Sequence, residues 1–269
     1  MVTKLLNYNS NIIPEEKAPQ LLPNSVFRSK DGLFESMLML NNQIQLLPFH
    51  FARLDKGMQQ LGFVFPFLFD LSFFEKEILK TVQANHIAPN GRIRFQVFKE
   101  HHQDCIFIVE VVDVEPSVYA YNQEGWKLGL VNNNWKQLDD TTALKAINPN
   151  LYTSTNDLVK QNNWDDLLLV NDGFISESGT ANLFIVRDDV IYTPPLSQGC
   201  IAGVMRTYVI DAIQKMELRF FEKPISTEML LQADEVFLTN AVRRIKWVGK
   251  IENKKYLYKY SLWLSGNFF

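Results

Sequence analysis

The stretch from Ile175 to Arg206 limits the fold more than any other part of the chain. It carries Glu177 near its start, and it ends in a loop with Gly199 and Gly203 directly before a helical pattern. Glycines at a loop-to-helix junction allow a tight turn that leaves N–H groups facing outward at the helix N-terminus. Such a junction attracts phosphate, although glycines also occur at ordinary helix starts. Short strands followed by a helix of this kind predict an α+β fold.

Composition narrows the class of protein. A length of 269 residues favours one large or two modest domains, and 46% hydrophobic with 21% charged residues is typical of a globular chain. A net charge of −3 with scattered lysines argues against nucleic-acid binding. Two cysteines, Cys105 and Cys200, give no disulfide framework or zinc spacing, which favours a cytoplasmic location. We expect no signal peptide, no membrane segment and no metal site.

Hydrophobic periodicity predicts the elements. In the first half we expect strands at 3–8, 36–47, 92–100 and 104–112, and helices at 49–61 and 71–85. In the second half we expect a helix ending at 156–162, a helix at 203–216, and strands at 166–170, 181–187, 190–192 and 235–239. Ser72, with Glu75 three residues later, is the expected N-cap of helix 71–85. A change of pattern predicts a smaller N-terminal domain at 1–114, a linker at 115–122 and a larger domain at 123–269.

Three residues could have a role in binding or catalysis, and each also has a simpler structural interpretation. Lys145 has apolar neighbours, and burial would favour the neutral amine that forms a Schiff base, but a lysine can also extend to solvent from a half-buried strand. Arg53 offers a planar fork for a phosphate on helix 49–61, or it is a solvated surface residue. Glu177 could equally be a solvated turn residue. We expect all four histidines at the surface.

Nine sequence blocks occur in an order that favours the chemical roles of these residues over the simpler interpretations. The chain resembles the class IV aminotransferases, the pyridoxal 5'-phosphate (PLP) enzymes of fold type IV, which include D-amino-acid and branched-chain aminotransferases and 4-amino-4-deoxychorismate lyase. The matching blocks are 7–9, 31–36, 51–54, 92–95, 145–148, 175–184, 192–195, 203–206 and 233–241. This resemblance implies a two-domain fold like that of D-amino-acid aminotransferase. It also implies a homodimer that takes a small, amino-acid-like substrate.

The resemblance also assigns roles to residues. It implies that Lys145 binds PLP covalently and moves the proton at the substrate α-carbon, while Glu177 holds the ring nitrogen protonated. Arg53 and the amides of Val204 and Met205 are similar to the family's phosphate contacts. The other implied cofactor contacts are Thr180, Asn240 and Ala241. The implied substrate contacts are Phe34, Arg92 and Arg94.

The reaction follows less directly from the motifs. Ser36 stands where lyase-like members commonly have a hydroxyl residue, and Asn240-Ala241 is similar to the lyase version of its turn. These features favour a lyase of folate synthesis that forms 4-aminobenzoate and pyruvate by β-elimination. Lys30 and Trp247 depart from the family pattern in the substrate region. The alternatives are an aminotransferase for branched-chain or D-amino acids and a catalytically silent relative that binds PLP.

Overall fold

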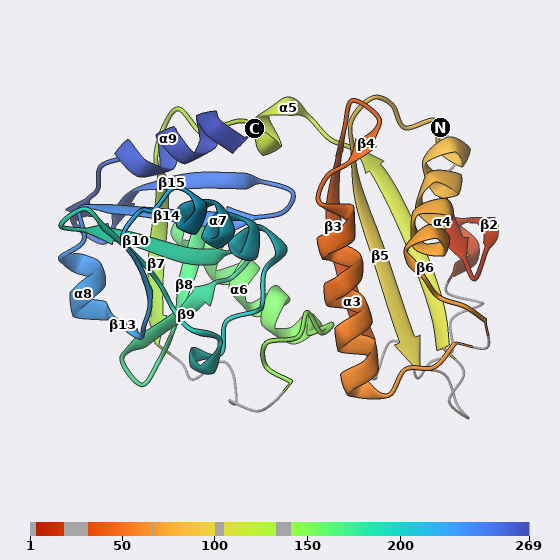
Figure 1. Cartoon of the computed structure of the whole chain (residues 1–269), viewed down its shortest axis with the longest axis horizontal. Helices are drawn as coiled ribbons and strands as arrows, with labels where there is room; N and C mark the ends of the chain where they lie inside the picture. Colours follow the sequence, from red (N-terminus) through yellow and green to blue (C-terminus); the bar gives the residue numbers. More distant parts are fainter. Residues whose placement is uncertain (1–3, 19–31, 66, 100–104, 133–140, 269) are drawn as a thin grey trace. The chain divides into compact units, whose positions relative to one another are not determined.

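The chain forms two compact units (Figure 1). The computed structural model describes residues 4–18, 32–65, 67–99, 105–132 and 141–268. The first unit is built from residues 1–115 together with the short stretch Leu144–Ile147, and the second from 116–143 and 148–269. Lys30, His101 and His102 lie outside the described residues.

The first unit contains an antiparallel sheet with the strand order β2-β1-β6-β5-β3-β4. Its strands are β1 (Leu5–Tyr8), β2 (Asn11–Pro14), β3 (Gly32–Leu40), β4 (Gln43–Ile44), β5 (Gly91–Lys99) and β6 (Cys105–Asp113). The turn from β3 to β4 uses Asn41 and Asn42, both with positive φ, which asparagine tolerates. The central strands β3 and β5 pair over eight residues, which fixes which of their side chains lie opposite one another.

Two helices, α3 (Leu47–Leu61) and α4 (Leu71–Ala84), cover one face of this sheet (Figure 1). Leu54 of α3 and Phe74 of α4 are buried against it, as their helical spacing predicts. The N-cap of α4 is Asp70, whose carboxylate accepts a hydrogen bond from the Phe73 N–H at 2.8 Å. The expected cap Ser72 is wrong, because the extended backbone that a cap requires occurs at Asp70 and Ser72 already lies in the first turn.

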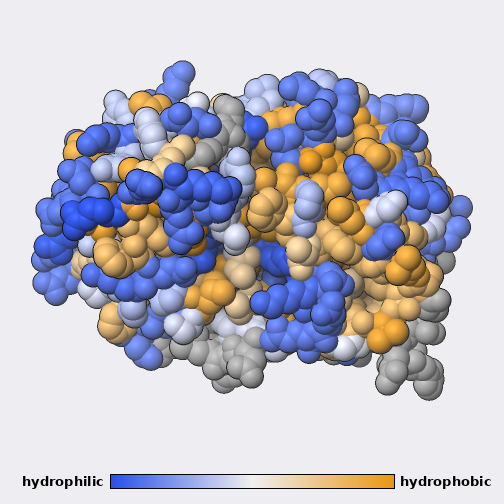
Figure 2. Space-filling view, in the orientation of Figure 1, coloured by the Kyte–Doolittle hydropathy of each residue, from blue (hydrophilic) through white to orange (hydrophobic). Residues whose placement is uncertain are grey.

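The segment that joins α3 to α4 is rich in phenylalanine. The rings of Phe65 and Phe69 stack with centroids 4.6 Å apart, and further rings extend the cluster into the core. Val64, Phe67 and Leu68 remain exposed, and Figure 2 shows apolar surface over the unit that contains α3 and α4. In the part of the chain that the structure describes, no helix combines the length and apolar character needed to cross a membrane.

Residues 144–147 return to the first unit and pair with the first residues of β3, Gly32 to Phe34, along the edge of that strand. The N–H of Phe34 donates to the Lys145 carbonyl at 3.1 Å, and the N–H of Ile147 donates to the Gly32 carbonyl at 2.8 Å. A Cβ at Gly32 would lie 2.7 Å from Ile147 Cδ1, so glycine permits this close approach. Lys145 is therefore held by main-chain bonds beside β3.

The second unit contains a larger mixed sheet with the order β12-β11-β10-β14-β15-β7-β8-β9-β13, and β16 pairs with β15. Its strands are β7 (Trp126–Asn132), β8 (Asp166–Asn171), β9 (Phe174–Ser178), β10 (Asn182–Arg187), β11 (Val190–Thr193), β12 (Phe220–Glu222), β13 (Ile225–Ser226), β14 (Glu235–Asn240), β15 (Arg244–Ile251) and β16 (Lys254–Lys255). Its helices are α5 (Pro116–Tyr119), α6 (Pro149–Asn162), α7 (Val204–Lys215), α8 (Thr227–Leu231) and α9 (Lys259–Phe268). Apolar residues of β7, β8, β10, β14 and β15 form its core.

The segment after α5 is hydrogen-bonded to β15. Asn122 accepts the Trp247 N–H through Oδ1 at 3.1 Å and the indole N–H through its carbonyl at 2.8 Å. The Trp247 ring also packs against Tyr258, with centroids 4.6 Å apart. Next to this contact, a Cβ on Gly125 would lie 2.3 Å from the Cα of Gly249, so the two glycines let the strands approach closely.

Candidate active site

Lys145 and Arg94 share one aromatic ring in the first unit. The Lys145 amine lies 4.5 Å from the centroid of Phe34, and the Arg94 guanidinium lies 4.7 Å from it. Cations are attracted to the face of an aromatic ring at such distances. Phe34, Lys145 and Arg94, three of the residues expected from the sequence, are therefore brought together.

The strand register explains this grouping. Cross-strand partners point to the same face of a sheet, and Ser36 on β3 is opposite Arg94 on β5. Arg92 lies two residues before Arg94 on that face and is exposed. Glu110 is opposite Arg94 on β6, but its carboxylate contacts Gln96 at 3.3 Å and Lys4 at 3.8 Å. Among the described residues no carboxylate pairs with Arg94, and its buried Nε has no hydrogen-bond partner.

Arg53 lies on the other face of β3, where Glu35 points toward α3. The Glu35 carboxylate accepts hydrogen bonds from Arg53 Nε at 2.8 Å and Nη2 at 2.5 Å. His50 contributes a third contact, with Nδ1 2.5 Å from Glu35 Oε2. An ionised carboxylate can only accept, so His50 donates through Nδ1 and its buried Nε2 has no partner among the described residues.

The electrostatics of this triad follow from burial and charge. Burial alone would raise the pKa of Glu35, but the charge of Arg53 and the hydrogen bond from His50 lower it to about 2. Burial lowers the pKa of His50, against the opposing effect of Glu35, and the charges of Arg53 and Lys145 lower it further. The triad therefore carries an ionised Glu35, a cationic Arg53 and a neutral His50 at pH 7. The expectation that all histidines lie at the surface is wrong for His50.

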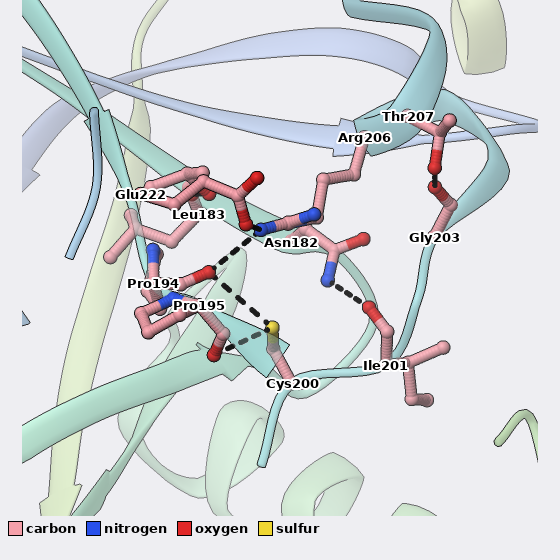
Figure 3. Close-up of polar contacts among 11 residues, drawn as sticks. Asn182, Leu183, Pro194, Pro195, Cys200, Ile201, Gly203, Arg206, Thr207 and Glu222 are labelled. Atoms are coloured by element: carbon pink, nitrogen blue, oxygen red, sulfur yellow. Dashed lines mark hydrogen bonds and ion pairs between the residues drawn. The ribbon is translucent and has the colours of Figure 1, made fainter. Parts of the chain in front are cut away.

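Glu177 on β9 belongs to the second unit and is buried. Its Oε2 accepts the Ile201 N–H at 3.0 Å and lies 3.2 Å from Asn182 Nδ2. The same Asn182 amide donates to the Ile201 carbonyl at 2.9 Å (Figure 3). Two N–H donors fix the orientation of this carboxylate, which fits the contact with a ring nitrogen that the family resemblance implies.

The junction before α7 has the features of a phosphate site. Gly203 caps α7 without a side-chain hydrogen bond, and Val204 and Met205 form the buried start of the helix. A Cβ at Gly203 would lie only 1.9 Å from Asn182 Oδ1. Thr239 pairs with Asn182 across the sheet, and its buried Oγ1 has no partner among the described residues. Uncapped N–H groups beside an unpaired hydroxyl fit the phosphate of PLP.

Arg206 fixes the loop that leads into this junction. Its Nη2 donates to the Pro194 carbonyl at 2.9 Å and contacts the Glu222 carboxylate at 2.5 Å (Figure 3). The Cys200 thiol lies 3.6 Å from the carbonyls of Pro194 and Pro195. Contacts of Arg206 and Cys200 with the carbonyls of Pro194 and Pro195 therefore fix the loop that leads into α7.

The remaining expected cofactor residues form two linked turns. Asn240 Nδ2 donates to the Thr180 carbonyl at 2.6 Å, and Asn240 Oδ1 accepts the N–H groups of Val242 and Arg243 at 2.9 and 3.1 Å. Ala241 follows Asn240 in the turn between β14 and β15. Thr180 and Asn240 are therefore brought together within the second unit.

Sequence reasoning missed Glu35, His50 and Asn182. One signal was present, since His50 lies three residues before Arg53 and such residues share a helix face. Nothing local marked Glu35 as their partner, because it comes from a separate strand.

Comparison with known proteins shows which family the chain belongs to. The family model for amino-transferase class IV matches residues 32–251. A D-alanine aminotransferase of Bacillus licheniformis is 24% identical over 261 residues, covering 92% of this chain and 88% of the relative. An aminodeoxychorismate lyase of Bacillus subtilis (strain 168) is 26% identical over 258 residues, covering 90% and 85%.

A solved structure gives the corresponding comparison of folds. The branched-chain amino acid aminotransferase from Thermobaculum terrenum in its PLP-form matches with a TM-score of 0.81 at 20% identity, covering 98% of this chain and 92% of that chain. The predicted α+β fold of type IV is confirmed. The chain belongs to the class IV aminotransferases, a family of enzymes that depend on pyridoxal 5'-phosphate.

Proposed function

We propose that the chain is a lyase that converts 4-amino-4-deoxychorismate to 4-aminobenzoate and pyruvate. The observation that carries this proposal is the environment of Arg94. Its guanidinium shares the Phe34 ring with Lys145, has no carboxylate partner among the described residues, and lies two residues from the exposed Arg92. A partly buried guanidinium without a carboxylate partner among the described residues, such as that of Arg94, favours an anionic ligand. The proposed substrate carries two carboxylates, whereas an aliphatic amino acid carries one.

Each residue role expected from the sequence belongs to this proposal. Lys145 would hold PLP, Glu177 would contact the ring nitrogen, and the α7 amides of Val204 and Met205 with Arg53 would bind the phosphate. Thr180, Asn240 and Ala241 would complete the cofactor contacts. When bound, PLP accepts the electrons released at the substrate carbon next to nitrogen. The homodimer implied by the family resemblance and the cytoplasmic location favoured by the cysteine content are part of the same proposal, and sedimentation velocity tests the dimeric state.

The Lys145 amine acts as the base in the proposed reaction. It removes the proton from the ring carbon that bears the substrate nitrogen, and the C–O bond on the adjacent carbon breaks. The ring becomes aromatic, and the oxygen leaves with the three-carbon enol, which takes up a proton to become pyruvate. Arg94 and Arg92 bind carboxylates, while the Ser36 hydroxyl, opposite Arg94, donates a hydrogen bond to the substrate.

Pyruvate release tests the proposal. The PLP-loaded protein is supplied with 4-amino-4-deoxychorismate and no 2-oxo acid, and pyruvate is followed with a coupled dehydrogenase. We expect turnover that Lys145→Ala abolishes together with the cofactor absorption band. Lys56→Ala, which removes an exposed lysine of α3, is the matched control and should retain turnover.

The alternative is an aminotransferase, as several relatives of this chain are named. Absence of pyruvate together with amino transfer from a D- or branched-chain amino acid to 2-oxoglutarate would establish that reaction instead. Absence of both activities in a protein that binds PLP would indicate a silent relative.

A further inference from the structure

Asp166, at the start of β8, is a buried carboxylate to which the proposed reaction gives no role. Its Oδ1 accepts the Leu167 N–H at 2.8 Å. Its Oδ2 accepts the hydroxyls of Ser178 at 2.9 Å and Thr180 at 2.6 Å. Among the described residues no cation forms an ion pair with it. A buried carboxylate without a paired cation is costly, so its hydrogen bonds are the reason that it can be accommodated.

The turn that follows Glu177 folds around this carboxylate. Ser178 Oγ, which donates to Asp166, also accepts the Ala181 N–H at 2.8 Å. A Cβ on Gly179 would lie 2.9 Å from Asp166 Oδ1, so the turn fits closely against the carboxylate. The backbone on the C-terminal side of Glu177 is thus positioned by Asp166.

Thr180 extends the same network to the second turn. Its hydroxyl has one proton, which goes to Asp166, and its lone pair accepts Arg243 Nη1 at 3.1 Å. The Thr180 carbonyl meanwhile accepts Asn240 Nδ2 at 2.6 Å. The Arg243 guanidinium lies 5.4 Å from the Trp126 ring.

These hydrogen bonds join the Asp166 carboxylate to the Arg243 guanidinium through the neutral Thr180 hydroxyl. Burial raises the pKa of Asp166, and the Thr180 hydrogen bond and the Arg243 charge oppose that rise. Hydrogen bonds in such a chain polarise one another. Moving either turn would break a contact that the other turn also uses.

We propose that Asp166 is a positioning residue for the cofactor. Through Thr180 it sets the Glu177 turn and the Asn240-Ala241 turn at a fixed spacing, so that both can contact PLP together. This inference rests on the cofactor contacts assigned under the proposed function, but not on which reaction follows.

Titration of the apoenzyme with PLP tests the inference without any substrate. Asp166→Asn keeps the size of the side chain. It also places the amide NH2, which is a donor, against the Leu167 N–H or against the hydroxyls of Ser178 and Thr180, which are donors too. We expect its dissociation constant for PLP to rise about tenfold or more. Asp165→Asn is the matched control, because Asp165 is exposed and, within the part of the chain that the structure describes, its carboxylate accepts only the Lys127 N–H, at 2.7 Å. It should bind PLP like the unchanged protein.

A pair of variants at Thr180 separates positioning from general stability. Thr180→Val removes the hydroxyl that links Asp166 to Arg243 and should weaken PLP binding, and Thr180→Ser, which keeps that hydroxyl, should bind PLP more tightly than Thr180→Val. Arg243→Gln should be less than additive with Asp166→Asn, since both act through that hydroxyl. PLP dissociation constants within roughly twofold of the unchanged protein for both Asp166→Asn and Thr180→Val would overturn the inference, including where the melting temperature falls.

A failure of pyruvate release would leave this result unaffected, because the titration measures only cofactor binding. Loss of PLP binding in Asp166→Asn with normal binding in Asp165→Asn supports the inference whichever reaction the enzyme catalyses.

Discussion

Replacing Glu35 by Gln should loosen β3 and α3 selectively. Glu35 accepts three hydrogen bonds, two from Arg53 and one from His50, and is fully enclosed. A fall of its pKa from 4.5 to about 2 corresponds to about 3 kcal/mol, since a tenfold change in proton affinity is worth about 1.4 kcal/mol. Removing one partner of a buried ion pair costs about 3–5 kcal/mol, which agrees with that figure.

Amide hydrogen exchange of peptides from β3 and α3 measures this loss. If local opening limits exchange, about 3 kcal/mol corresponds to roughly a hundredfold faster exchange in Glu35→Gln. Glu75→Gln is the control, because Glu75 is exposed on α4 and should leave the rates unchanged. Exchange within about threefold of the unchanged protein would refute the view that the charge of Glu35 holds these elements together.

The structure also predicts how the contribution of Glu35 to stability changes as the pH falls. The folded pKa of Glu35 lies below its unfolded value, so its contribution to stability is complete above pH 4.5 and is lost as the pH falls toward about 2. The difference between the unchanged protein and Glu35→Gln should therefore shrink across this window. A difference that stays constant from pH 5 to about 2 would contradict the assignment of an ionised Glu35.

Three further substitutions test other parts of the structure. Ser36→Gly should lower lyase kcat/KM about tenfold and amino transfer less, and equal losses would remove the role given to the hydroxyl. Asp70→Ala should lower the free energy of unfolding by about 1 kcal/mol and Ser72→Ala by less than half of that, as denaturant unfolding would show; the reverse order would restore Ser72 as the cap. Gly125→Ala should cost about 1–3 kcal/mol through its clash with a neighbouring strand, while Gly266→Ala, with open space around it, should be neutral or stabilising; similar melting temperatures for the two would refute that packing argument.

Local patterns predicted much of the fold. Helix 49–61 corresponds to α3 and helix 203–216 to α7, because each carries an apolar face with three- and four-residue spacing. The cap of α4 was misplaced by two residues, since Asp70 and Ser72 both suit a cap and only the backbone conformation distinguishes them. Ends of elements depend on such choices between neighbouring residues.

The sequence predicted the site less well where a residue depends on a partner that is distant in the sequence. The contact of Lys145 with Phe34 requires residues 144–147 to return to the edge of β3, and no local pattern encodes that return. His50 has apolar neighbours on both sides, yet its burial depends on a carboxylate from β3. Motifs recognised as a set identified Glu177 and the α7 junction. Asn182 lies in the same block as Glu177, but no pattern indicated its contact with Ile201, and Asp166 lies outside every block.

The return of residues 144–147 also affects how the chain is made. During synthesis, the first 115 residues emerge from the ribosome well before Leu144–Ile147. Until then, the outer edge of β3 at Gly32–Phe34 lacks the backbone partners that later cover it. An uncovered strand edge can pair with another nascent chain. A fragment that stops before residue 144 would therefore lack the candidate catalytic lysine and expose an edge prone to aggregation, so the first unit reaches its finished form only after part of the second has been translated.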